Sequence, residues 1–307
     1  MANPRTFQIQ EISAHPGPVP GRGTRREEQV CKYIDVSTCI GCKACEVACV
    51  EWNDHPFRET TFNDTYQTMP TTEWNYYNLI KFVEDQRGDN FMWLMRKDQC
   101  LHCEDPGCLR ACPADGAIIK YENGIVDFQQ ENCIGCGYCI SGCPFDIPKF
   151  HPNTKKVYKC TLCSDRVGQG LEPACVKACP TGCLKFGTKS DMVQIAGLRA
   201  KQLREVSGFA NAGVYDPASI GGTHVVYVLH DITQPERYGL PANPIIPPSY
   251  TYWKWFAKPA GLLMAVLGIG AVFFHRIMYG PKLPQPAPPE VRTGPTEEIE
   301  AGRKERP

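Results

Sequence analysis

Sixteen of the eighteen cysteines of this 307-residue chain fall into four blocks of four. The blocks are Cys39, Cys42, Cys45 and Cys49; Cys100, Cys103, Cys108 and Cys112; Cys133, Cys136, Cys139 and Cys143; and Cys160, Cys163, Cys175 and Cys179. The first and third blocks have the spacing C-x₂-C-x₂-C-x₃-C, and a proline follows the third and the fourth. This spacing, closed by proline, binds 4Fe–4S clusters. At four thiolates per cluster, the sequence predicts four 4Fe–4S clusters and hence an electron-transfer protein.

The fourth cysteine of each block is expected to ligate a neighbouring cluster, as it does in two-cluster ferredoxins. Blocks one and four enclose blocks two and three, so we expect nested pairs, although the spacing alone would also allow sequential pairs. The expected ligand sets are Cys39, Cys42, Cys45 and Cys179; Cys160, Cys163, Cys175 and Cys49; Cys100, Cys103, Cys108 and Cys143; and Cys133, Cys136, Cys139 and Cys112.

Other uses of cysteine fit the spacing less well. A disulfide framework suits a short secreted chain, and structural zinc takes two pairs of cysteines instead of triplets closed by C-P. Cys31 and Cys183 lie outside the blocks, and we interpret them as small buried hydrophobic residues rather than ligands. Lys43 and Lys159 stand beside ligands, where a positive charge would raise a cluster's potential by stabilising its reduced form.

The segments between and after the blocks predict the small sheets of an α+β fold. Asn-Gly at residues 123–124 lies between two alternating apolar runs, which is a strong hairpin signal. The expected strands cover 74–83, 91–96, 117–121, 125–128, 184–187 and 223–230, with a loop over 84–90. Ser190 is the expected N-cap of a helix that runs to about Val206.

A single C-terminal transmembrane helix is expected after these modules. Residues 259–274 contain no charge, and this uncharged segment is slightly short for a membrane-spanning helix. Flanking aromatic residues, together with Lys258 and Arg276, suit the membrane interfaces. A buried core helix is the alternative, and the proline-rich segments on both sides favour the anchor. Lysine and arginine are balanced across the span, so they do not orient it.

The fold class is therefore α+β, with two nested bacterial-ferredoxin-like modules that carry four 4Fe–4S clusters and one C-terminal transmembrane helix. The expected domains are an extended arm (1–30), an outer module (31–91 with 156–190), an inner module (92–155), a helix, strand and proline-rich linker (191–250), the anchor (251–280) and a disordered tail (281–307).

Charge and composition exclude some classes of protein. The charges of the 33 basic and 33 acidic residues cancel. The sequence has no basic stripe of the kind that binds nucleic acid. Four oxidised clusters with their thiolates would add about −8, so the loaded protein is acidic. Arg25-Arg26 is followed by acidic residues, and no hydrophobic stretch comes after it. We therefore interpret it as a solvated turn and not as a twin-arginine signal.

Several further segments carry a family resemblance. Residues 31–45, CKYIDVSTCIGCKAC, are similar to the opening block of the iron–sulfur (β) subunit of membrane-bound respiratory formate dehydrogenases. CPFDIPK (143–149), YVLHD (227–231), YGLP (238–241) and Trp255 with Lys258-Pro259 also resemble that family. The resemblance extends from about residue 25 to 280.

The resemblance implies a non-catalytic electron-transfer subunit. It implies a large partner that oxidises formate on a molybdenum or tungsten pterin centre, and a membrane cytochrome b with haem that reduces quinone. It also implies a single-pass protein of the bacterial inner membrane, with its iron–sulfur head on the periplasmic side. No residue of this chain resembles a formate-binding group, and His275 is interpreted as an interfacial histidine instead of a haem ligand.

Two other functions fit the four blocks. The same kind of subunit serves hydrogenases and reductases of sulfur compounds, and the metal of the catalytic partner would distinguish these enzymes. A stand-alone, membrane-anchored ferredoxin is the other possibility, and it would purify without partners.

Overall fold

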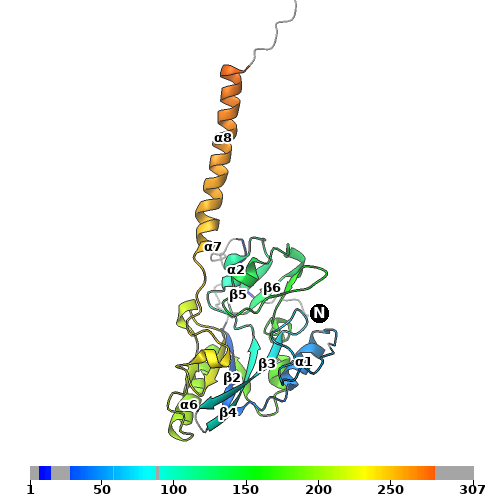
Figure 1. Cartoon of the computed structure of the whole chain (residues 1–307), viewed down its shortest axis with the longest axis vertical. Coiled ribbons are helices and arrows are strands. Elements are labelled where there is room, and N and C mark those ends of the chain that lie inside the picture. Colours follow the sequence, from blue (N-terminus) through cyan, green and yellow to red (C-terminus); the bar gives the residue numbers. More distant parts are fainter. Residues whose placement is uncertain (1–6, 15–27, 58, 88–89, 281–307) are drawn as a thin grey trace, which may run out of the picture. The chain divides into compact units, whose positions relative to one another are not determined.

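The computed structural model describes residues 7–14, 28–57, 59–87 and 90–280. The expected tail (281–307), Arg25 and Arg26 lie outside the described residues, as does most of the expected N-terminal arm. The chain divides into two units, residues 1–253, here called the head, and residues 254–307. Figure 1 shows the head as a mixture of short helices and small sheets.

The largest sheet of the head has four strands in the order β10-β11-β2-β9. These strands are β10 (Gly213–Tyr215), β11 (Val225–Leu229), β2 (Val30–Asp35) and β9 (Leu184–Thr188). β2 and β11 are parallel, and the other neighbours are antiparallel. The five residues of β11 are all buried, as expected for a central apolar strand. Helix α6 (Lys189–Glu205) packs on this sheet through Met192, Ala196 and Ala200.

Two expectations change at this sheet. The expected helix and strand of region 191–250 are present, but they do not form a separate segment, because α6, β10 and β11 complete the sheet that β2 and β9 begin. The N-cap of α6 is Thr188, not Ser190: the Thr188 hydroxyl accepts a hydrogen bond from the backbone N–H of Asp191 at 3.2 Å. The helix therefore begins directly where β9 ends.

A long antiparallel hairpin is formed by β3 (Asn78–Arg87) and β4 (Asn90–Gln99). The loop expected over 84–90 is mostly strand, because pairing continues to Arg87 and Asn90. The charged residues of this segment are typical of a loop. At the tip of a two-stranded ribbon, however, both faces can be exposed to water, so polar residues can still pair as strands. The hairpin also crosses the expected boundary between residues 91 and 92.

A second sheet has the order β1-β5-β6, with β1 (Ile9–Ile12), β5 (Ile118–Tyr121) and β6 (Val126–Phe128). The β5–β6 hairpin lies where its Asn-Gly turn indicates. β1 comes from the expected N-terminal arm and pairs antiparallel with β5, so this part of the arm belongs to the head. β7 (Lys149–Phe150) and β8 (Val157–Tyr158) form one further pair.

The remaining elements of the head are short. The α-helices are α1 (Ala44–Trp52), α2 (Gly107–Ala111), α3 (Tyr138–Ser141), α4 (Ser164–Val167), α5 (Ala174–Lys177) and α7 (Ser249–Tyr252). The 3₁₀ turns are η2 (Val36–Thr38), η3 (Gln130–Asn132), η4 (Ala218–Ile220) and η5 (Pro235–Tyr238). Within the proline-rich segment, Tyr238 and Leu240 belong to the main buried core, so this stretch is partly internal.

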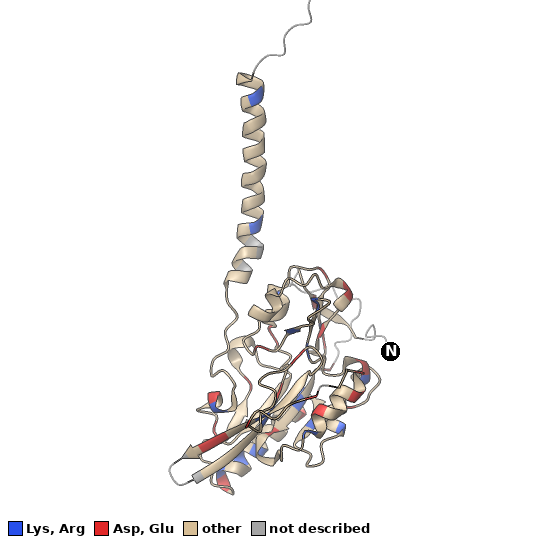
Figure 2. Cartoon of the chain, turned by 45° about the vertical axis from the view of Figure 1, so that its right-hand side comes forward, with Lys and Arg blue, Asp and Glu red and all other residues tan. Residues whose placement is uncertain are grey.

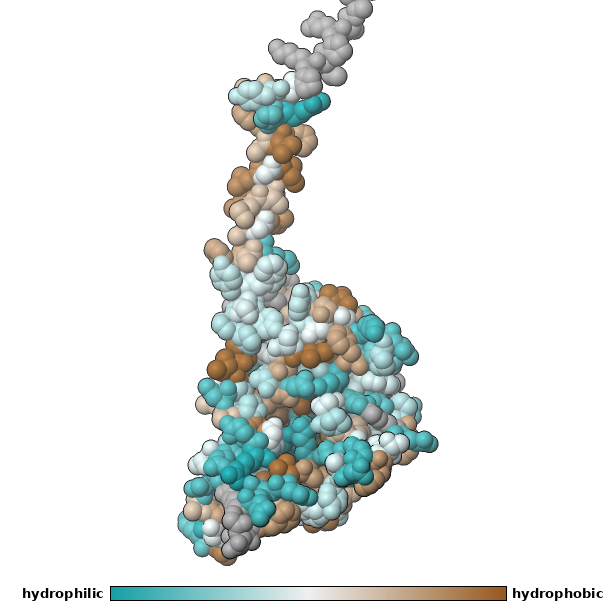
Figure 3. All heavy atoms as spheres, in the orientation of Figure 1, coloured by the Kyte–Doolittle hydropathy of each residue, from teal (hydrophilic) through white to brown (hydrophobic). Residues whose placement is uncertain are grey.

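One helix of the described residues could cross a membrane. A π-turn, η6 (Trp253–Ala257), leads into α8 (Lys258–Tyr279), whose 22 residues have a mean hydropathy of 1.8 in their most apolar window. At 1.5 Å per residue this is about 33 Å, enough for a bilayer core of about 30 Å. Its side chains are unburied and apolar (Figure 3), with basic residues only near its two ends (Figure 2).

Candidate iron–sulfur cluster sites

Two pairs of packed helices bring the cysteine blocks together. Cys45 and Cys49 lie four residues apart on α1, which packs against α5. α5 carries Cys175, and Cys179 follows its C-terminal end. Residues four apart lie on the same helix face, so each helix can supply one ligand to its own block and one to the partner block. Blocks one and four therefore lie together.

The inner blocks repeat this arrangement. α2 carries Cys108 and ends at Cys112, and it packs against α3, which carries Cys139 and is followed by Cys143. Blocks two and three therefore lie together. This packing favours nested pairs over sequential ones, and the ligand sets stay a prediction.

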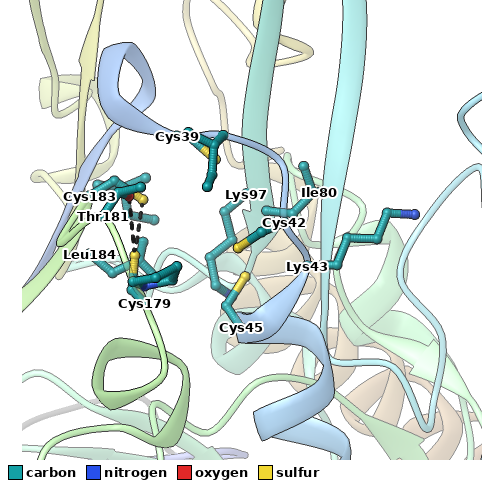
Figure 4. A pocket seen from close by; sticks show the side chains of 13 residues that line it. Cys39, Cys42, Lys43, Cys45, Ile80, Lys97, Cys179, Thr181, Cys183 and Leu184 are labelled. Atoms are coloured by element: carbon teal, nitrogen blue, oxygen red, sulfur yellow. Dashed lines mark hydrogen bonds between the residues drawn. The ribbon is translucent and has the colours of Figure 1, made fainter.

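The first site, site A, is a cavity lined by four of the expected ligands and by one more cysteine. The four are Cys39, Cys42, Cys45 and Cys179. Figure 4 shows their side chains converging from the loop before α1, from the start of α1 and from the turn before β9. The loop bends at Gly41 and Lys43, which have φ of +64° and +60°. Left-handed residues allow tight turns, so Cys39 and Cys42 of the loop and Cys45 at the start of α1 line one space.

Two further cavities contain the expected inner sets. Site C is lined by Cys100, Cys103, Cys108 and Cys143. Site D is lined by Cys112, Cys133, Cys136 and Cys139. The site D loop bends at Gly135 and Gly137, with φ of +72° and +77°, so it has the same two left-handed positions as the site A loop.

Site B comprises Cys49, Cys160, Cys163 and Cys175, all buried. Cys49 and Cys160 pack in one apolar cluster. The pKa of Cys49 is raised by burial and then by the neighbouring Cys160 and Cys175. These cysteines are therefore close enough to interact electrostatically.

The four sites form a row. Cys45 of site A interacts with Cys175 of site B, Cys100 of site C shares an apolar cluster with Cys49 and Cys160 of site B, and Cys108 of site C shares another with Cys112 and Cys139 of site D. Only sites A and D contain an exposed cysteine among the four ligands expected at each, Cys42 and Cys136. The order is therefore A–B–C–D, with both ends at the surface of the head.

Buried lysines lie among the cysteines, and they test whether an anionic cluster would fit. Lys97 lines site A, is 2% exposed, and its Nζ has no hydrogen-bond partner within the described residues. Lys32, at site B, donates to Cys175 Sγ at 3.1 Å and to Gln99 Oε1 at 3.2 Å. An unpaired ammonium is costly to bury unless a negative charge lies beside it. An anionic cluster at sites A and B would supply that charge, so the donor sets and their surroundings fit it.

These charges favour the thiolate form that binds iron. Burial raises the pKa of Cys175, but the charges of Lys32 and Lys97 outweigh burial and hold that pKa below its usual value. Lys159, which lines site C, is 2% exposed and donates to the carbonyl oxygens of Val126 and Cys160 at 2.5 and 2.9 Å. Each of sites A, B and C therefore has a buried lysine beside it.

Lys43 differs from the sequence expectation. Its Nζ lies 5.4 Å from the centroid of the Phe82 ring, and Figure 4 shows its side chain pointing away from the cysteines. Sequence reasoning selected Lys43 for its position beside Cys42 and missed Lys97 and Lys32. The signal for both was a lysine inside a strand that precedes a cysteine block, at β4 before Cys100 and at β2 before Cys39.

The two cysteines outside the blocks have different surroundings. Cys31 is fully buried between the main sheet and α6, with Met192 and Ala196 in the same cluster, and burial raises its pKa to about 12. Cys183 is also buried, but it lines site A. A hydrogen bond from Cys183 lowers the pKa of Cys39 to about 6. Cys183 is thus a buried residue with polar contacts to the site, which the sequence did not indicate.

Comparison with known proteins agrees with these sites. Residues 38–117 and 91–189 each match the family described as a 4Fe-4S dicluster domain, and residues 246–289 match a family described as formate dehydrogenase N, transmembrane. Two dicluster domains and the four cysteine quartets account for four 4Fe–4S clusters. The third match covers the membrane helix and indicates membrane anchoring.

Curated relatives cover nearly the whole chain. It is 52% identical over 286 residues to the formate dehydrogenase-O iron–sulfur subunit of Escherichia coli K12, covering 90% of this chain and 93% of the relative. It is 52% identical over 254 residues to that strain's nitrate-inducible formate dehydrogenase iron–sulfur subunit, covering 82% and 86%. It is 49% identical over 283 residues to the formate dehydrogenase iron–sulfur subunit of Haemophilus influenzae, covering 91% and 90%. The chain therefore belongs to the family of formate dehydrogenase iron–sulfur subunits.

Proposed function

We propose that this chain conducts electrons from a formate-oxidising catalytic subunit, which holds molybdenum or tungsten on pterins, to a membrane cytochrome b that reduces quinone. The observation that carries the proposal is the row of four cysteine sites whose two ends lie at the surface of the head. An electron that enters at one end can reach the other end without leaving the head. The role is electron transfer, and formate oxidation takes place in the partner.

The proposed ligands are the four nested sets, one set at each of sites A to D. Each 4Fe–4S cluster, when bound, accepts and gives up one electron at a time. The chain's own contribution is to hold the thiolates, to bury all four cysteines of site B, and to place lysine ammonium groups beside sites A, B and C. These features set the distance between neighbouring sites and the potential of each.

We assign the electron entrance to site A and the exit to site D. The chain leaves the head beside site D: α7 packs on α2, and the Tyr250 hydroxyl donates to Ser141 Oγ of α3 at 2.7 Å. The membrane helix begins a few residues later in the sequence. A membrane partner that binds the anchor is thus expected at the site D end, which leaves site A for the catalytic partner. Exposed Ile40 and Ile134, beside the ligands of sites A and D, suit such contacts.

We further propose that α8 anchors the chain in the bacterial inner membrane with the head on the periplasmic side. Protease added to spheroplasts should digest a tag placed in the head. Digestion of the tag only after the inner membrane is opened would show that the head lies on the cytoplasmic side.

The function is tested by tagging the chain and purifying it without oxygen from detergent-solubilised membranes. We expect molybdenum or tungsten to accompany it, and formate to reduce its clusters as followed by EPR. Hydrogen and tetrathionate serve as matched control substrates. Nickel with hydrogen-driven reduction, or reoxidation of the reduced clusters by tetrathionate with no response to formate, would assign the chain to another oxidoreductase. Purification without partners would favour a stand-alone ferredoxin.

A further inference from the structure

Site A contains a fifth cysteine that the cluster does not need as a ligand. Cys183 is 5% exposed, lines the cavity, and has its Sγ 3.4 Å from Cys179 Sγ. Figure 4 shows the two side chains facing each other at the edge of the site. Cys183 and Cys39 line the same cavity. The cavities of sites C and D are each lined by four cysteines, so this extra thiol distinguishes site A from them.

The main sheet holds Cys183 in this place. Its carbonyl oxygen accepts a hydrogen bond from the backbone N–H of Asp35 at 2.9 Å. The next residue, Leu184, begins β9 and pairs with Ile34 of β2. The backbone of Cys183 is therefore fixed on the edge of the cavity, and its thiol stays beside Cys39 and Cys179.

The chemistry of ligation decides the direction of the hydrogen bonds. A cysteine that ligates iron is a thiolate and can only accept hydrogen bonds. Cys183 must then be the donor to the Cys179 sulfur if Cys179 binds the cluster. The Thr181 hydroxyl, 3.7 Å from Cys179 Sγ, is a second side-chain donor to Cys179.

We propose that Cys183 is a positioning residue that donates an S–H hydrogen bond to the ligand sulfur of Cys179 and thereby raises the reduction potential of the site A cluster. Reduction adds negative charge that is shared by the ligand sulfurs, so a donor to those sulfurs stabilises the reduced form more than the oxidised one. The inference rests on the proposed ligands of site A and not on the identity of the electron donor.

The test is an EPR redox titration of the whole complex, purified without oxygen, with Cys183→Ala, Cys183→Ser and Cys31→Ala. Cys31 is the matched control, because it is a buried cysteine that packs in a different cluster. We expect Cys183→Ala to keep all four clusters and to lower the potential of one cluster. A tenfold change in its reduction equilibrium would be a shift of about 59 mV. Serine also donates a hydrogen bond, so Cys183→Ser should restore part of the shift, and Cys31→Ala should produce none.

Two results would overturn the proposal. Unchanged potentials for all four clusters in Cys183→Ala would show that the thiol does not act on the ligands. Loss of one cluster's iron, about four atoms per chain, in the alanine or the serine variant would make Cys183 a ligand or a structural residue instead. Neither result affects the proposed function, which depends on formate reducing the clusters of the unaltered complex.

Discussion

Sites A and D are built on two loops of similar conformation, but the residues that line the two cavities differ. Each loop has two left-handed positions, at residues 41 and 43 in site A and at 135 and 137 in site D. Each exposes its second cysteine and an isoleucine. The wall of site A includes Lys97, Lys43 and Cys183. Apart from its cysteines, the wall of site D is apolar or glycine, and it includes Ile118, Phe128 and Val157.

This difference separates two tasks of the chain. The loop sets the geometry of the ligands, and the surrounding strands set the charge that the ligands experience. β4 supplies Lys97, and the turn before β9 supplies Cys183, and both lie beside site A. Two lysines outside the site D cavity wall lie near it: Lys156 donates to the carbonyl of Cys133 at 2.5 Å, and the Lys159 Nζ is 5.0 Å from the centroid of the Phe128 ring. We therefore expect the site A cluster to have the higher reduction potential of the two.

The largest effect should come from removing a crossed ligand. Cys112→Ala should abolish the site D cluster, although Cys112 belongs to the sequence block of site C, because it lines the site D cavity. Iron should fall by about four atoms per chain, and EPR should show the three other clusters. Cys179→Ala is the matched change at site A. If Cys112→Ala removed the site C signal and left site D intact, the nested ligand assignment would be wrong.

The next effect should come from the buried charge at site A. Lys97→Met should lower the potential of the site A cluster, and less strongly that of site B, because the reduced forms lose a nearby positive charge. A unit charge at roughly 10 Å and an effective dielectric of about 20 contributes about 1.7 kcal/mol, or about 70 mV for one electron. The site D potential is the internal control in the same EPR titration. If the Lys97→Met complex kept wild-type potentials, the charge of Lys97 would not account for a difference in potential between sites A and D.

A smaller effect should distinguish the two loops by their neighbours. A Cβ at Gly135 would lie 2.8 Å from the backbone oxygen of Lys155, whereas a Cβ at Gly41 would meet only the movable side chains of Phe82 and Met95, at 2.7 and 2.8 Å. Both positions have positive φ, which costs a non-glycine residue about 1–3 kcal/mol. Gly135→Ala should therefore destabilise the holoprotein more than Gly41→Ala. The measurement is the temperature at which cluster absorbance is lost under nitrogen, and the reverse order would mean that the Lys155 backbone moves.

The smallest effect is expected from Lys43→Gln. The Lys43 ammonium points away from the cysteines and lies over the Phe82 ring, so it is screened by water more than Lys97 is. The site A potential should shift less than in Lys97→Met when both variants are titrated in the same buffer. A larger shift from Lys43→Gln would show that position in the sequence matters more than the direction of the side chain.

The sequence predicted the cluster type, the anchor and most strands, because cysteine spacing, Asn-Gly turns and long apolar runs are local signals. It could not choose between nested and sequential pairs, because that choice depends on the packing of α1 on α5 and of α2 on α3. It also separated the helix and strand of 191–250 from the outer module, since pairing of β11 with β2 joins residues nearly two hundred positions apart.

The candidate site shows the same limit. The sixteen block cysteines were identified as candidate ligands from spacing alone, and the structure brings them into four groups. Cys183 and Lys97 enter site A only through the sheet and the hairpin that place them there. Neither residue belongs to a motif, so a side chain's direction within the fold was needed to find them.

The central claim is that electrons cross the head from site A to site D. The most direct test is to add formate, without oxygen, to the complex that carries Cys112→Ala, and to follow the remaining clusters by EPR and quinone reduction by absorbance. We expect three clusters to become reduced while quinone reduction is lost. Quinone reduction at the unaltered rate, with the site D cluster absent, would contradict it.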